Sequence, residues 1–175
     1  MIQRLSLCLA VVGVAALVSA PAQQTGSKML QPQMKVGPDA GSYQNPAGKM
    51  GEKPSKPWTA TTIAAAVNKQ PQPGKVTTAT GEIIDLSCYL QLGKHGQAHV
   101  PCGTKCLKSG EPIGLLTSDG TVYMLMAEEH DPRRDGETTF RQAAIDNFGK
   151  IMAVTGTETS HSGYKAIYVQ GYVKK

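Results

Sequence analysis

Ile113-Gly-Leu-Leu-Thr-Ser-Asp-Gly-Thr-Val-Tyr-Met-Leu-Met-Ala127 carries the clearest structural signal in this chain. Two apolar runs, residues 113–117 and 121–127, flank the polar triplet Ser118-Asp119-Gly120. An Asp-Gly pair between two such runs favours a tight hairpin, because both residues tolerate the positive φ angles of the turn. The stretch therefore predicts two neighbouring antiparallel strands.

Three further strands are expected on either side of this hairpin. Each is a run rich in Thr, Val, Ile or Tyr that ends near turn residues. They are residues 75–86 before the hairpin, and residues 150–157 and 164–173 after it. A helix is expected over residues 139–148, because Thr139 and Gln142 have capping-box spacing and Gly149 follows the last turn.

The predicted order is strand, cysteine-bearing insertion, strand, strand, helix, strand, strand. Five strands with a helix between the third and the fourth is the order of the OB-fold barrel. In this topology, residues 75–175 resemble exported bacterial OB-fold proteins. The resemblance implies a mainly β domain, built as a five-stranded OB-like barrel with one helix between strands 3 and 4.

The first residues have the composition of a secretory signal peptide. Arg4 supplies a positive charge, residues 5–18 are apolar, and Ala20 and Ala22 are the small residues of a cleavage site. The apolar run is short for a bilayer span. We expect residues 1–22 to be removed on export, which leaves a periplasmic or secreted protein without a membrane span.

Residues 23–74 are rich in Gln, Gly, Pro, Ser and Lys, a composition typical of a disordered linker. Within this segment, residues 61–69 predict a short helix that ends before Pro71. The domain at 75–175 carries equal numbers of acidic and basic side chains, so the net charge of +5 comes from the residues before it. A domain without basic excess is not expected to bind nucleic acid.

Three cysteines and two histidines gather in the insertion between the first two strands. They are Cys88, His95, His99, Cys102 and Cys106. The fourth cysteine of the chain, Cys8, would be lost with the signal peptide. An odd number of thiols cannot all pair within one chain, so at least one is free, pairs with another molecule, or binds a metal.

A short helix is expected over residues 102–108. Pro101 suits its first turn, and Ser109-Gly110 suits its end. Residues i and i+4 of a helix share a face, so Cys102 and Cys106 would point the same way. The insertion therefore predicts a short helix whose two thiols are available to one ligand.

Three thiolates and one imidazole complete a tetrahedral zinc site, or supply soft ligands for copper(I). The spacing Cys102-x-x-x-Cys106, with a histidine nearby, resembles the copper motif of the copper-delivery proteins of cytochrome oxidase assembly. That resemblance implies copper binding at these two thiols. We expect Cys88, Cys102 and Cys106 to bind the metal, with His99 as the fourth ligand and His95 as the other candidate imidazole.

A structural disulfide is the main alternative. A bond from Cys88 to Cys102 or Cys106 would close a short loop and contribute roughly 3 kcal/mol. The domain would then be an interaction module that binds a peptide, glycan or protein on its barrel face without metal. A third reading, thiol redox chemistry, normally uses Cys-x-x-Cys, which the segment lacks.

The sequence thus predicts an exported protein that holds or delivers copper or zinc and is not an enzyme. Its expected partner is a metal-donor or metal-acceptor protein.

Overall fold

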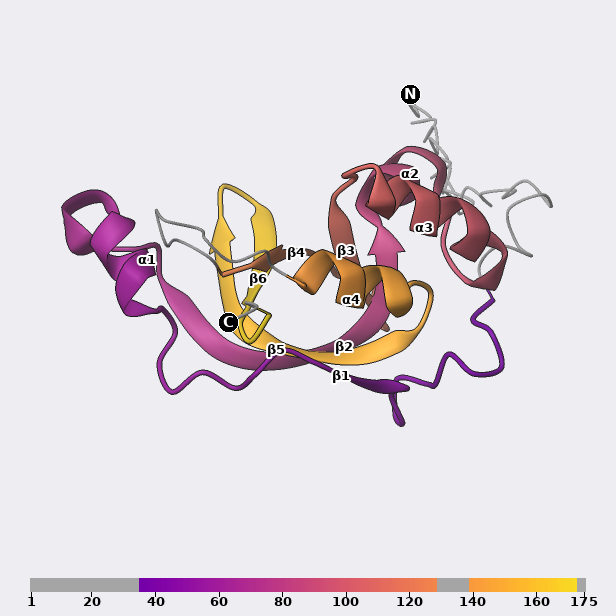
Figure 1. Ribbon diagram of the computed structural model, residues 1–175, viewed down its shortest axis with the longest axis horizontal. Helices are drawn as coiled ribbons and strands as arrows, with labels where there is room; N and C mark the ends of the chain where they lie inside the picture. The colour runs from indigo at the N-terminus through magenta and orange to yellow at the C-terminus, as the bar shows by residue number, and fades with distance from the viewer. Residues whose placement is uncertain (1–34, 129–138, 173–175) are drawn as a thin grey trace, which may run out of the picture.

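A closed five-stranded barrel forms the centre of the computed structural model, which describes residues 35–128 and 139–172 (Figure 1). Its strands, in chain order, are β2 (Gly74–Asp85), β3 (Ile113–Thr117), β4 (Val122–Ala127), β5 (Ile151–His161) and β6 (Tyr164–Val169). Around the barrel the order is β2-β3-β4-β6-β5, and β5 pairs with β2 to close it. All neighbours are antiparallel except β4 and β6, which run parallel.

Helix α4 (Phe140–Asp146) lies between β4 and β5, the third and fourth strands of the barrel. The predicted fold class is therefore confirmed, and the strand order is compatible with the OB-like topology. The predicted hairpin is also confirmed: β3 and β4 pair around Gly120, whose φ is +82°. The Asp119 carboxylate accepts a hydrogen bond from the Thr121 N–H at 3.0 Å, which fixes the turn.

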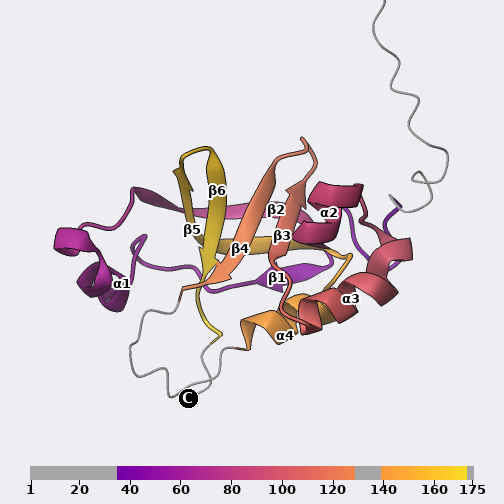
Figure 2. The same ribbon diagram turned by 90° about the horizontal axis from the view of Figure 1, so that it is seen from above.

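The insertion after β2 folds into α2 (Leu86–Leu92), the 3-10 turn η3 (Gln97–His99) and α3 (Val100–Lys108). The predicted helix at 102–108 is confirmed as part of α3, whereas α2 is absent from the sequence interpretation, which extended the strand to Leu86. Figure 2 shows α2 and α3 at one end of the barrel and α1 (Ala60–Ala65) at the opposite end.

Helix α2 forms because both of its ends are capped. The Asp85 side chain accepts hydrogen bonds from the first turn, and Gly93 ends the helix in the left-handed conformation, with φ of 65°. The apolar residues of the run 86–92 fit the pattern of a strand as well as that of a helix. The capping residues on either side, Asp85 and Gly93, therefore decide that the run is helical.

Part of the segment expected to be a linker packs on the barrel. Strand β1 (Gly48–Met50) pairs in parallel with β5, and Met50 is only 2 % exposed. Helix α1 and the 3-10 turn η2 (Val67–Lys69) lie where the short helix is expected. The described residues of this segment thus differ from a disordered linker, because a few isolated apolar side chains anchor it without periodicity.

The expected signal peptide, residues 1–22, lies outside the described residues. Among the helices of residues 35–128 and 139–172, none combines the length and the apolar character needed to cross a membrane. The division of the chain at residues 22 and 74 stays a prediction.

The core fills the barrel and continues under α3 and α4. Its central side chains include Ile83, Leu115, Val154 and Ile167, all with 0 % exposure. Phe148, which follows α4, packs against α3 at Gly103, where an added Cβ would lie 2.0 Å from the Phe148 ring. This glycine lets α3, the helix that bears two cysteines, approach the core closely.

We predict that Gly103→Ala lowers the free energy of unfolding by about 1–3 kcal/mol, because the new methyl group overpacks against Phe148. In a free helix the same change is stabilising by about 1 kcal/mol, so the sign separates packing from helix propensity. The measurement is urea denaturation followed by circular dichroism. Lys105→Ala, an exposed site on the same helix, is the control and should be nearly neutral. A stabilised Gly103→Ala variant would contradict the packing of α3 described here.

Candidate metal centre

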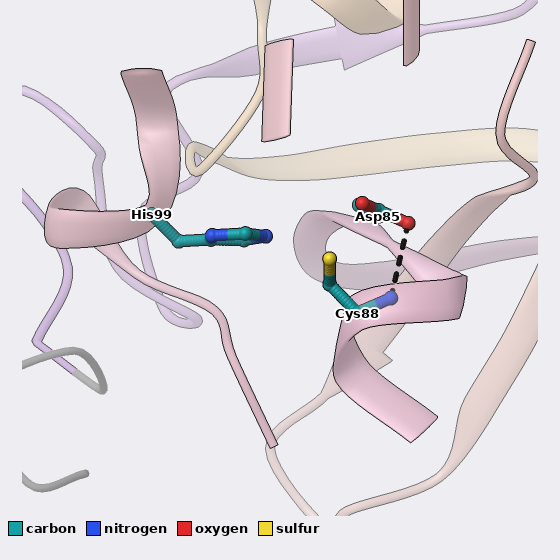
Figure 3. A group of neighbouring side chains, drawn as sticks. All are labelled: Asp85, Cys88 and His99. Carbon is teal, nitrogen blue, oxygen red and sulfur yellow. Dashed lines mark hydrogen bonds between the residues drawn. The ribbon is translucent and has the colours of Figure 1, made fainter. Parts of the chain in front are cut away.

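Asp85, Cys88 and His99 lie together where β2 passes into the insertion (Figure 3). Asp85 is the last residue of β2, Cys88 lies in the first turn of α2, and His99 ends η3. One ligand atom from each side chain lies within 4.8 Å of the others. Figure 3 shows the His99 ring pointing toward the Asp85 carboxylate and the Cys88 sulfur.

The two oxygens of Asp85 have different surroundings. Oδ1 accepts hydrogen bonds from the backbone N–H groups of Ser87 at 3.0 Å and Cys88 at 3.2 Å. Oδ2 has no hydrogen-bond partner, and water does not reach it because Asp85 is 0 % exposed. Leaving a buried polar atom unpaired costs about 1–3 kcal/mol, and more when the group is charged. The capping hydrogen bonds therefore orient the carboxylate through Oδ1 and leave Oδ2 available to bind a ligand.

His99 shows the same pattern. Its side chain is nearly inaccessible, at 2 % exposure, and its Nε2 atom has no hydrogen-bond partner. The ring packs edge-on against Phe148, with 5.7 Å between the ring centroids. Burial lowers the pKa of His99, although the Asp85 carboxylate acts in the opposite direction. The neutral imidazole that results is the form that binds metals.

Two thiols surround the same carboxylate. Burial, followed by the effect of the Asp85 carboxylate, raises the pKa of Cys88. The same two causes, in the same order, raise the pKa of Cys106 to about 12, with a further contribution from Cys102. Asp85 and Cys102 are therefore among the neighbours of Cys106, although Cys106 lies outside the group whose ligand atoms are all within 4.8 Å of one another. Cys102 itself is exposed on the first turn of α3.

His95 lies in a different environment from His99. Its Nδ1 is 2.8 Å from Oε2 of the buried Glu82, and the other Glu82 oxygen accepts the Gly96 N–H at 2.6 Å. The His99 N–H in turn donates to the Gly96 carbonyl at 3.0 Å. Glu82 and His95 thus hold the loop that leads to His99.

The structure therefore brings Cys88 and His99 together and places Cys106 next to them. Cys102 lies at the surface and His95 binds Glu82, so neither belongs to the group of three. Asp85 is not among the ligands expected from the sequence, because that expectation rests on cysteines and histidines alone. A usable signal was present: an acidic residue directly follows the apolar pair Ile83-Ile84 in a strand that is buried at this end.

The predicted alternative of a disulfide from Cys88 to Cys102 or Cys106 is wrong for the structure described. All three cysteines of residues 35–128 and 139–172 are free thiols. Cys88 and Cys106 are free thiols near the Asp85 carboxylate and near each other, and Cys102 is exposed.

A cavity of about 430 Å³ lies elsewhere, between α1 and the outer face of β4, β5 and β6. Trp58, Met126 and Tyr168 are among its lining residues, and none of the cysteines is. The thiol cluster lies at the opposite end of the barrel from this cavity (Figure 2).

We predict that iodoacetamide at pH 7.5 alkylates Cys102 at least about tenfold faster than Cys88 or Cys106 in metal-free protein. The thiolate is the reactive form, and the raised pKa of Cys88 and Cys106 keeps both largely protonated. Peptide mass spectrometry over time measures the three rates. In 8 M urea, as an unfolded control, the rates should converge. Equal rates in the folded protein would contradict this arrangement of thiols.

Comparison of the chain with protein-family models, with curated proteins and with solved structures finds no match.

Proposed function

We propose that this protein binds one transition-metal ion, preferably zinc(II), between Asp85, Cys88 and His99, with Cys106 as the fourth donor. One observation carries the proposal. In the part of the chain that the structure describes, the buried side-chain atoms without a hydrogen-bond partner are Asp85 Oδ2 and His99 Nε2. Both belong to the same three-residue cluster. A cation between them would satisfy both atoms at once.

The spacing of the donors supports an ion of this size. In a tetrahedral zinc site with bonds of 2.0–2.3 Å, the ligand atoms lie about 3.3–3.8 Å apart. The three donors already lie within 4.8 Å of one another, so small side-chain movements bring them to that distance. The Asp85 cap orients one ligand in advance, as partners of metal ligands commonly do.

The mixture of donors favours zinc over copper(I). Copper(I) prefers sulfur ligands, whereas zinc accepts carboxylate oxygen, imidazole nitrogen and thiolate sulfur in one site. Binding requires Cys88 and Cys106 to lose their protons, and a dipositive ion repays that cost through thiolate bonds. Copper remains the alternative ion of this proposal.

The biological role that fits such a site is to hold or deliver metal outside the cytoplasm. The signal-like residues 1–22 support export. Free thiols in an oxidising compartment are prone to pairing, and a bound ion would protect them. A metal-donor or metal-acceptor protein is the partner that we propose.

We predict that protein purified without chelator contains close to one equivalent of zinc per chain, measured by plasma emission spectrometry. Cys88→Ser and His99→Gln should each weaken zinc binding about 100-fold or more, because each removes a ligand. His161→Gln, an exposed histidine on the β5–β6 hairpin, is the matched control and should bind as the wild type does. Wild-type protein that holds no metal and takes up none in titration would contradict the proposal.

We predict opposite effects of Asp85→Asn on the two forms of the protein. The asparagine oxygen can still cap α2, and removing a buried charge leaves the metal-free protein at least as stable as the wild type. The zinc-induced rise in Tm should be lost, because the ligand oxygen has lost its charge. Thermal unfolding with and without excess zinc measures both effects. A metal-free variant much less stable than the wild type would indicate a purely structural role for Asp85.

A further inference from the structure

The three thiols of the insertion and the two buried donors, Asp85 and His99, differ in their exposure to solvent. Cys102 is exposed, Cys106 and Cys88 are partly buried, and Asp85 and His99 are inaccessible. Cys102 and Cys106 are four residues apart within α3, so their side chains share one face of that helix. The neighbouring positions Gly103 and Leu107 are buried, so the cysteine face lies at the border between solvent and core.

The residues that follow α3 connect the end of this helix to the start of α2. The Glu111 N–H donates to the Cys106 carbonyl at 3.1 Å, and the Glu111 carboxylate accepts the hydroxyl of Ser87. The Leu86 N–H donates to the Pro112 carbonyl at 3.0 Å. These contacts hold the end of α3 against the start of α2, and Cys106 has both Asp85 and Cys102 as neighbours.

Two of the four proposed donors, Asp85 and His99, present almost no surface to an incoming ligand. Cys88 and Cys106 are partly exposed, and a partner thiol is attached to a bulky chain. Exchange of a metal between proteins proceeds most readily when an exposed ligand on one side meets an incoming ligand on the other. Cys102 is the exposed thiol of this cluster.

We propose that Cys102 is the transfer ligand of the site, through which a thiol-bearing partner protein gives or takes the ion; this rests on the function proposed above. During release, the Cys102 thiol loses its proton to solvent and binds the ion, and a bond to one buried donor breaks. The partner's ligands, its thiolate first, then bond to the ion in turn as the bonds to the remaining buried donors and to Cys102 break, and solvent returns a proton to each thiolate that is released. The ion keeps its charge, so no oxidant or reductant takes part.

The surface around Cys102 also indicates the charge of the partner. Helix α3 carries Lys105 and Lys108 in its last turn and has no acidic residue. An acceptor with acidic side chains around its thiol would approach this surface favourably.

The experiment uses zinc-loaded full-length mature protein and dithiothreitol as the thiol acceptor, with zinc release followed by a colorimetric zinc dye. In the wild type, the release rate should rise with dithiothreitol concentration. In Cys102→Ser and Cys102→Ala, the affinity for zinc should stay unchanged while the release rate loses its dependence on dithiothreitol. Lys105→Ser, exposed on the same helix, is the control and should retain that dependence.

The other outcomes are distinct. Release that depends equally on dithiothreitol in the wild type and in both Cys102 variants overturns the transfer role and leaves the proposed function intact. A large loss of zinc affinity in both variants also overturns it, because Cys102 would then belong to the resting site. A wild type that binds no metal refutes the proposed function itself.

Discussion

The carboxylate of Asp85 is the group on which the rest of the site depends. One oxygen caps α2 and thereby ends β2, turns the chain and sets Cys88 in place. The other oxygen is buried without a partner beside His99. A single side chain therefore links the barrel, the first helix of the insertion and the donors of the candidate metal centre. A cation bound there, as we propose, would offset the cost of burying its charge.

Local patterns predicted the barrel well. The Asp119-Gly120 turn and the alternation of the strands reflect chemistry within a few residues of one another. The helix expected over residues 139–148 is present as α4, although the Thr139 side chain does not cap it as the capping-box spacing predicts and bonds to the Tyr172 carbonyl instead. Those signals sufficed for the order of elements along the chain, and the strand order of the barrel, β2-β3-β4-β6-β5, is compatible with the OB-like topology expected from it. The end of β2 was harder, since residues 86–92 fit a strand or a helix until the Asp85 cap is recognised.

The site was only half predictable for a different reason. Cys88 and His99 were expected from residue type, but Asp85 becomes a candidate only when the fold shows that its second oxygen is unpaired. Likewise, nothing in sequence spacing separates His95 from His99. The distinction comes from Glu82, a buried carboxylate on β2 that pairs with His95 and not with His99. Such pairings depend on the tertiary structure and cannot be inferred from residues that are adjacent in the sequence.

The contact of His99 with Phe148 connects the candidate metal centre to the hydrophobic core. Phe148 touches Gly103 on one helix, follows the last turn of another, and presents its ring to the imidazole. Any interaction that fixes the His99 imidazole therefore also restrains the Phe148 ring, which packs against it. Under the proposed function, the amide hydrogens of α4, a helix that supplies none of the proposed donors, would report whether an ion is bound, since their exchange with solvent should slow on binding.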